Sequence, residues 1–152
     1  MKLSRLTILL TLALLAISCR KEPAATPEPL LDVNANNISG VWRLVQWNGN
    51  APAEGTYVYI EFTRRDQLFT IYQNLDSAGG RKITGRYNIY TDDESGAVIR
   101  GLYDYGNGDW AHRYIISALT SVRMTWTAKD DPDDVSVYER CEEIPADILE
   151  SL

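Results

Sequence analysis

Apolar and polar residues alternate with a period of two along most of the chain from Gly40 onward, which is the spacing of β-strands. In residues 56–62, Val58, Ile60 and Phe62 share one face, while tyrosines and a glutamate share the other. Polar turns separate the alternating segments. The pattern predicts about eight strands, over residues 41–47, 56–62, 68–72, 83–90, 98–103, 113–119, 122–127 and 135–140.

The order and spacing of these segments predict an all-β fold. Short strands at near-regular spacing, with no helix between them, are typical of a sandwich or a barrel. An up-and-down meander connects them most simply, and closing it removes the exposed edges, so we expect an antiparallel barrel of about eight strands. After Cys141 the apolar spacing becomes helical and Pro145 suits a first turn, which predicts a short C-terminal helix capping the barrel.

The side chains predicted to face the interior are large, namely Trp42, Phe62, Phe69, Tyr87, Tyr114, Met124 and Trp126. An eight-stranded barrel is either filled by such side chains or holds one small ligand. Because the predicted strands are short, the sequence leaves open both a small cavity and a filled core.

The start of the chain has a different pattern. Lys2 and Arg5 precede an apolar run over residues 6–17, and Cys19 follows soon after it. A basic start, a short apolar run and small residues before a cleavage point are typical of a secretory signal peptide. The run is shorter than the roughly 20 apolar residues of a membrane-spanning helix.

The sequence Ala16-Ile17-Ser18-Cys19 resembles the lipobox of bacterial lipoproteins, although the usual leucine three places before the cysteine is an alanine here. The resemblance implies that residues 1–18 are removed as a signal peptide and that Cys19 becomes the acylated N-terminus. Charged residues 20–22 are similar to a surface-export signal of some Gram-negative lipoproteins. We therefore expect an exported outer-membrane lipoprotein, on the periplasmic face or the cell surface, held to the membrane by its acyl anchor.

Residues 20–38 combine prolines with asparagines and have no apolar period. Such a segment offers little apolar surface to offset the entropy of ordering it, and proline-rich segments are extended. We expect residues 19–38 to be the acylated cysteine and a flexible tether, and residues 39–152 to be the folded domain.

The net charge excludes some partners. The formal charge of −6 becomes more negative by two when Lys2 and Arg5 leave with the signal segment, which holds no acid. Binding to nucleic acid or to anionic lipid headgroups requires a basic surface. We expect no nucleic-acid partner, and a membrane contact through the acyl chains alone.

The sequence Gly40-Val41-Trp42 at the first predicted strand resembles the Gly-x-Trp of the lipocalin and calycin barrels, and Arg140 occupies the place of their terminal arginine. Met124-x-Trp126 followed by an acidic turn is similar to bacterial lipocalin-like lipoproteins. The resemblance implies that Trp42 plugs the closed end, with the Arg140 guanidinium across its indole in a cation–π contact of about 0.5–2 kcal/mol. It also implies a barrel that holds a small hydrophobic molecule.

Residues 103–110 form an aromatic loop that contains two glycines. Such a loop can grip a sugar or cover a barrel mouth, but tyrosine and tryptophan also simply end strands and pack on a rim. The candidate ligand or rim residues are Tyr87, Tyr103, Trp110 and Trp126.

Groups for catalysis or metal binding are scarce. His112 is the only histidine, which argues against a histidine-rich zinc site. A Ser-His-Asp triad would have to use His112, and no serine stands in a G-x-S-x-G sequence, so we expect a surface turn histidine. The acidic runs 130–134 and 92–94 lack the spacing of an EF-hand, so we expect solvated turns rather than calcium sites. Cys141 is expected to be a buried, unreactive thiol, the alternative being a reactive or intermolecular one. We predict no metal, no cofactor and no enzymatic activity.

Two functions follow from these expectations, and an enzyme is the least favoured third. The first is a lipid-anchored, lipocalin-like binding module for a small hydrophobic ligand at the cell envelope. The second is a barrel with a filled core, which serves as a protein-interaction or structural subunit of an envelope complex. A cavity of a few hundred cubic ångströms distinguishes the first function from the second.

Overall fold

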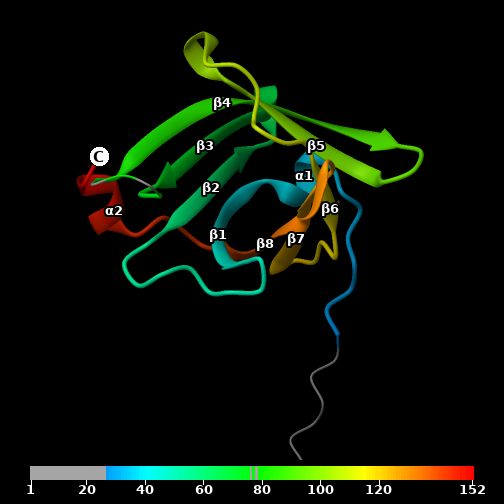
Figure 1. Ribbon diagram of the computed structural model, residues 1–152, viewed down its shortest axis with the longest axis horizontal. Helices are drawn as coiled ribbons and strands as arrows, with labels where there is room; N and C mark the ends of the chain where they lie inside the picture. Colours follow the sequence, from blue (N-terminus) through cyan, green and yellow to red (C-terminus); the bar gives the residue numbers. More distant parts are fainter. Residues whose placement is uncertain (1–26, 76, 78) are drawn as a thin grey trace, which may run out of the picture.

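The computed structural model describes residues 27–75, 77 and 79–152, and its strands form one closed antiparallel barrel (Figure 1). Each strand pairs with the next in sequence, and the last pairs with the first. The predicted fold class is therefore confirmed. The strands are β1 (Gly40–Trp47), β2 (Val58–Thr63), β3 (Leu68–Gln73), β4 (Arg81–Asp92), β5 (Gly96–Tyr103), β6 (Tyr114–Ser117), β7 (Arg123–Ala128) and β8 (Asp131–Cys141).

Strands β4, β5 and β8 begin at least two residues earlier than the alternating pattern predicted, and β4 also ends two residues later. The β4–β5 ladder continues to the pair Asp92–Gly96, because the Asp92 carboxylate accepts hydrogen bonds from the backbone of the tight turn that follows and also pairs with Lys129. Strand β8 begins at Asp131, so most of the acidic run expected to be a turn is strand. A register shift between Thr127 and Ala128 accommodates it.

The interior of the barrel is filled mainly by the large side chains that the alternation predicted. Trp42, Phe62, Phe69, Tyr87, Met124 and Trp126 are buried, and the half-buried Tyr114 packs against them. Trp110, which precedes β6 in a loop, also joins this core. The core therefore draws on a loop as well as on the strands.

The segment before β1 packs across one end of the barrel. A short helix, α1 (Ala35–Ile38), follows Asn34, which caps its N-terminus. The Asn34 side chain accepts hydrogen bonds from the backbone N–H groups of Asn36 and Asn37. Ile38 is fully buried, and the backbone N–H of Leu31 donates a 2.8 Å hydrogen bond to the Leu119 carbonyl. The expectation of a tether without fixed structure is wrong for residues 31–38, because their scattered apolar side chains find a surface that exists only when the barrel closes.

Trp42 and Arg140 lie at this closed end, and the contact expected between them is present. The guanidinium carbon of Arg140 is 4.1 Å from the centroid of the Trp42 ring. The three guanidinium nitrogens also donate, at 2.6–2.7 Å, to the backbone carbonyls of Asn37, Ser39 and Ser121. Gly40 has a positive φ of 116°, and a Cβ there would lie 2.7 Å from the guanidinium. Arg140 thus ties the N-terminal segment to the first and last strands.

The C-terminal helix α2 (Ala146–Glu150) does not cap the barrel as predicted. Ile148 of the helix and Ile144 before it pack on Tyr59 and Tyr72, which face outward from β2 and β3. These tyrosines offer an apolar surface on the outside of the sheet, and the helix covers it, while the closed end is already occupied by α1. Cys141 lies at the edge of this cluster and is half-buried rather than buried as expected. Its partial burial raises the pKa of the thiol, which disfavours the reactive thiolate.

The signal-peptide prediction for residues 1–18 and the acylation predicted at Cys19 lie outside the described residues. Within the part of the chain that the structure describes, no helix has the length and apolar character needed to cross a membrane.

Candidate functional site

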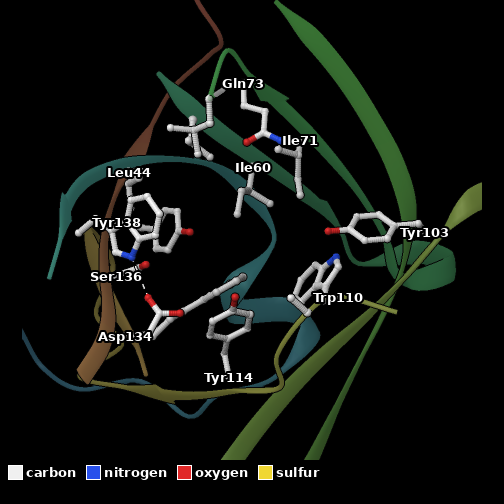
Figure 2. Close-up of a pocket in the computed structure, with 15 residues that line it drawn as sticks. Leu44, Ile60, Ile71, Gln73, Tyr103, Trp110, Tyr114, Asp134, Ser136 and Tyr138 are labelled. Atoms are coloured by element: carbon white, nitrogen blue, oxygen red, sulfur yellow. Dashed lines mark hydrogen bonds between the residues drawn. The ribbon is translucent and has the colours of Figure 1, made fainter. Parts of the chain in front are cut away.

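The open end of the barrel, opposite Trp42 and Arg140, contains a cavity of about 200 Å³ (Figure 2). Every strand except β4 contributes to its lining, together with the loop that precedes β6. Leu44, Val58, Ile60 and Ile71 supply its aliphatic part. The barrel is thus sealed at one end by its own side chains and hollow at the other.

Aromatic rings form the opposite part of the cavity wall. Trp126 lies at the centre of this group, with its ring centroid 5.3 Å from that of Tyr114, 5.6 Å from Trp110 and 5.0 Å from Tyr138. The planes are tilted rather than parallel, an arrangement that aromatic pairs favour. We name Trp110, Tyr114, Trp126 and Tyr138 the aromatic wall.

Trp110 reaches the wall because of Gly101 on β5. The indole lies so close to the backbone of Gly101 that a Cβ there would overlap with Cε2 of the ring, and the backbone N–H of Trp110 donates to the Gly101 carbonyl at 2.9 Å. Trp110 is 8% exposed, and its indole N–H has no hydrogen-bond partner among the described residues. The pairing of a glycine with a tryptophan therefore converts a loop residue into part of the barrel interior.

The polar groups of the cavity are one carboxylate and several neutral side chains. Asp134 accepts a 2.7 Å hydrogen bond from the indole N–H of Trp47. Figure 2 shows Tyr103 and Tyr114 directing their hydroxyls into the space between the lining residues. Gln73 and Ser136 complete the polar set.

The cavity tyrosines are neutral at physiological pH. Burial, assisted by the negative charge of Asp134, raises the pKa of Tyr114 to about 12. Burial likewise raises the pKa of Tyr103 and that of Tyr138. These phenols remain able to donate and accept hydrogen bonds, because a raised pKa keeps their protons in place.

The candidate residues from the sequence divide between the two ends of the barrel. Tyr103, Trp110 and Trp126 line the cavity. Tyr87 does not, since it packs edge-on against Phe62 at 5.1 Å and donates to the Thr63 carbonyl toward the closed end. Alternation correctly indicated that Tyr87 points inward, but it does not give depth along the barrel axis.

Several residues of the site are missing from the candidate set, and Tyr138 and Asp134 are the two that matter most for its chemistry. Tyr138 stands two residues before Arg140 on β8, which puts it on the same inward face. Asp134 belongs to the acidic run that was expected to be a turn. Tyr138, Ser136 and Asp134 are spaced by two residues, which places them on one face of a strand. Because the strand was predicted to begin at residue 135, this spacing was not extended to Asp134.

His112 is placed on the outside of the barrel, as expected for a surface turn. Its Nδ1 lies 2.7 Å from a carboxylate oxygen of Asp130, and this hydrogen bond raises the pKa of the imidazole. The described residues contain no group of three or more histidine, cysteine, aspartate or glutamate side chains arranged to hold a metal ion.

Comparisons with known proteins bear on the fold alone. No protein-family model and no curated protein matches the chain. Among solved structures, a lipocalin-like protein from Bacteroides uniformis is similar over 69% of this chain and 99% of its own, with a TM-score of 0.50 and 16% sequence identity. The closed barrel and this likeness define a lipocalin-like fold.

Proposed function

We propose that this protein is a lipid-anchored binding module that holds a small hydrophobic molecule in the open end of its barrel. The observation that carries the proposal is the cavity of about 200 Å³, which is lined by aliphatic side chains and the aromatic wall. Its size favours a ligand no larger than one or two rings, because a dry cavity of about 150 Å³ accepts benzene. The lipocalin-like fold supports the same function.

The proposed anchor would hold the closed end of the barrel toward the membrane. The described residues begin at Pro27, and Glu28 accepts a hydrogen bond from Ser121 in the β6–β7 connection at the closed end. Cys19 precedes Pro27 by eight positions, and a fully extended chain spans at most about 3.6 Å per residue. The acyl chains would therefore lie within about 30 Å of the closed end, with the cavity mouth on the far side.

The lipid anchor is tested by Cys19→Ala. We expect the variant to remain an uncleaved precursor or to leave the membrane fraction, because the thiol that takes the diacylglycerol is gone. Each buried acyl methylene contributes about 0.8 kcal/mol to membrane attachment, so its loss is readily measured. Membrane fractionation with acyl labelling is the measurement, and Cys141→Ala is the control that should behave as wild type. Unchanged labelling in Cys19→Ala would refute the anchor.

Ligand binding is tested by titrating the full chain with indole and following the tryptophan side-chain N–H resonances. Trp47, Trp110 and Trp126 line the cavity, whereas Trp42 is at the closed end and serves as an internal reference. We expect the first three resonances to shift and that of Trp42 to stay in place. Ala111→Trp, at the cavity mouth, should weaken binding about tenfold or more by filling the space.

The matched control is Ala146→Trp, which adds the same side chain to α2 on the outer face and should leave indole binding unchanged. A natural ligand is sought by native mass spectrometry of protein purified from its own host. Absence of both a retained molecule and any indole-induced shift would favour the alternative, a filled-core subunit that binds another envelope protein.

A further inference from the structure

We propose that the preferred occupant of the cavity is a small amine, with an apolar body against the aromatic wall and a protonated amino group beside Asp134. This inference rests on the proposed binding function and specifies the class of ligand. It follows from the charge at the open end, where the described lining of the cavity carries a carboxylate and no basic side chain.

The first argument is the charge of the lining. Among the described residues that line the cavity, Asp134 is the only formally charged one, and none is a lysine or an arginine. Within the described part of the chain Asp134 forms no salt bridge, and its hydrogen-bond donor is the neutral indole of Trp47. A carboxylate without a cationic partner, at the wall of a partly enclosed space, attracts a cation more strongly than it would in bulk water.

The second argument is the aromatic wall. The faces of tyrosine and tryptophan rings attract a cation within about 6 Å of their centroids. The rings of Tyr114 and Tyr138 lie 5.0–5.3 Å from that of Trp126, and all three face the same space as Asp134. An ammonium group would therefore meet a carboxylate and ring faces together, while the attached apolar group would contact Leu44 and its aliphatic neighbours.

The third argument concerns the anionic alternative. A carboxylate ligand in the same position would face Asp134, and the described part of the lining offers no cation to offset the repulsion. Two basic side chains near the open end form ion pairs on the outside of the barrel, Lys129 with Asp92 and His112 with Asp130. Neither of these two side chains lines the cavity. The unpaired N–H of Trp110 lies across the cavity from Asp134 in Figure 2, so it does not occupy the same position.

The proposal is tested by isothermal titration calorimetry of the full chain at pH 7 with three probes of similar size. They are 2-phenylethylamine, which is protonated, 2-phenylethanol, which is neutral, and phenylacetate, which is an anion. We expect the amine to bind about tenfold more tightly than the alcohol, and the anion to bind most weakly.

The matched variants are Asp134→Asn and Asp133→Asn. The first keeps an oxygen that accepts from Trp47 but removes the charge at the cavity, so the advantage of the amine over the alcohol should disappear while alcohol binding is retained. The second removes the same charge from the exposed neighbouring residue, which does not line the cavity, and should leave the order of affinities unchanged. Retained alcohol binding also shows that a variant has folded.

The outcomes separate this inference from the function on which it rests. Binding of the alcohol with equal or weaker binding of the amine would overturn the amine preference and leave the binding module in place. An amine preference that survives Asp134→Asn would overturn the role of the carboxylate. Failure of the amine to bind the wild-type chain would overturn the amine preference whatever the other two probes do, and the indole titration would then decide whether the binding module stands.

Discussion

Trp42→Ala will lower the free energy of unfolding by about 3–5 kcal/mol, the range for large-to-small changes of a buried aromatic side chain. Trp42 is 0% exposed, and its indole N–H donates a 2.7 Å hydrogen bond to the carbonyl of Ile38. The change leaves a cavity at the closed end and also removes the surface on which Arg140 lies. Since a typical domain is stable by only about 5–15 kcal/mol, urea denaturation should reveal a greatly weakened barrel.

Two variants make this prediction specific to the closed end. Trp47→Ala changes the other tryptophan of β1, which is 47% exposed, and should cost clearly less than Trp42→Ala. Arg140→Ala should also cost less, because Trp42 would still be largely buried. A double-mutant cycle between Trp42 and Arg140 should show coupling of at least a few tenths of a kcal/mol. Strictly additive effects would mean that the stacked pair contributes nothing beyond its separate contacts.

Gly101→Ala is expected to displace Trp110 and to destabilise the barrel by about 1–3 kcal/mol, the usual cost of overpacking. The new methyl group would overlap with Cε2 of the indole, so the ring must leave its position against β5. Because Trp110 belongs to the aromatic wall, the same change should alter the cavity. The predicted result is a lower midpoint of urea denaturation together with a shifted Trp110 side-chain resonance and weaker indole binding.

Gly79→Ala is the matched control for Gly101→Ala. A Cβ at Gly79 would meet nothing within 4 Å, and this exposed loop position lies outside the barrel interior. Surface substitutions of this kind usually change stability by no more than about 0.5 kcal/mol. If the two alanine variants were equally stable and bound indole equally, the contact between Gly101 and Trp110 would not be what positions the wall.

The closed end of the barrel contributes mainly to stability, and the open end provides the proposed binding site. At the closed end, Trp42 and α1 fill the interior of the barrel. Arg140 stacks on Trp42 and binds the backbone of the N-terminal segment, which it holds against the first and last strands. At the open end, aromatic and aliphatic side chains leave space around one carboxylate. Substitutions at Trp42 should therefore change stability more than ligand preference, and substitutions at Asp134 should do the opposite.

The strands and the faces that they bury could be predicted from the order of apolar and polar residues. Alternation fixed which residues of 56–62 point inward, because successive side chains of a strand lie on opposite faces of the sheet. It also placed Trp42 and Arg140 at the start of the first strand and the end of the last. In a closed meander these two strands are neighbours, so the contact between Trp42 and Arg140 could be expected from the sequence alone.

The depth of a residue along the barrel axis, and the packing of segments that have no periodic pattern, depend on contacts that form only in the folded chain. Tyr87 and Trp126 both point inward, yet one lies toward the closed end and the other lines the cavity, because strand register sets depth and depends on partners distant in sequence. The packing of residues 31–38, the position of α2 and the burial of Trp110 in the core were not predicted, for a related reason. Residues 31–38 cover the closed end, α2 covers the outside of β2 and β3, and Trp110 packs against Gly101. These three surfaces form only when the sheet has closed.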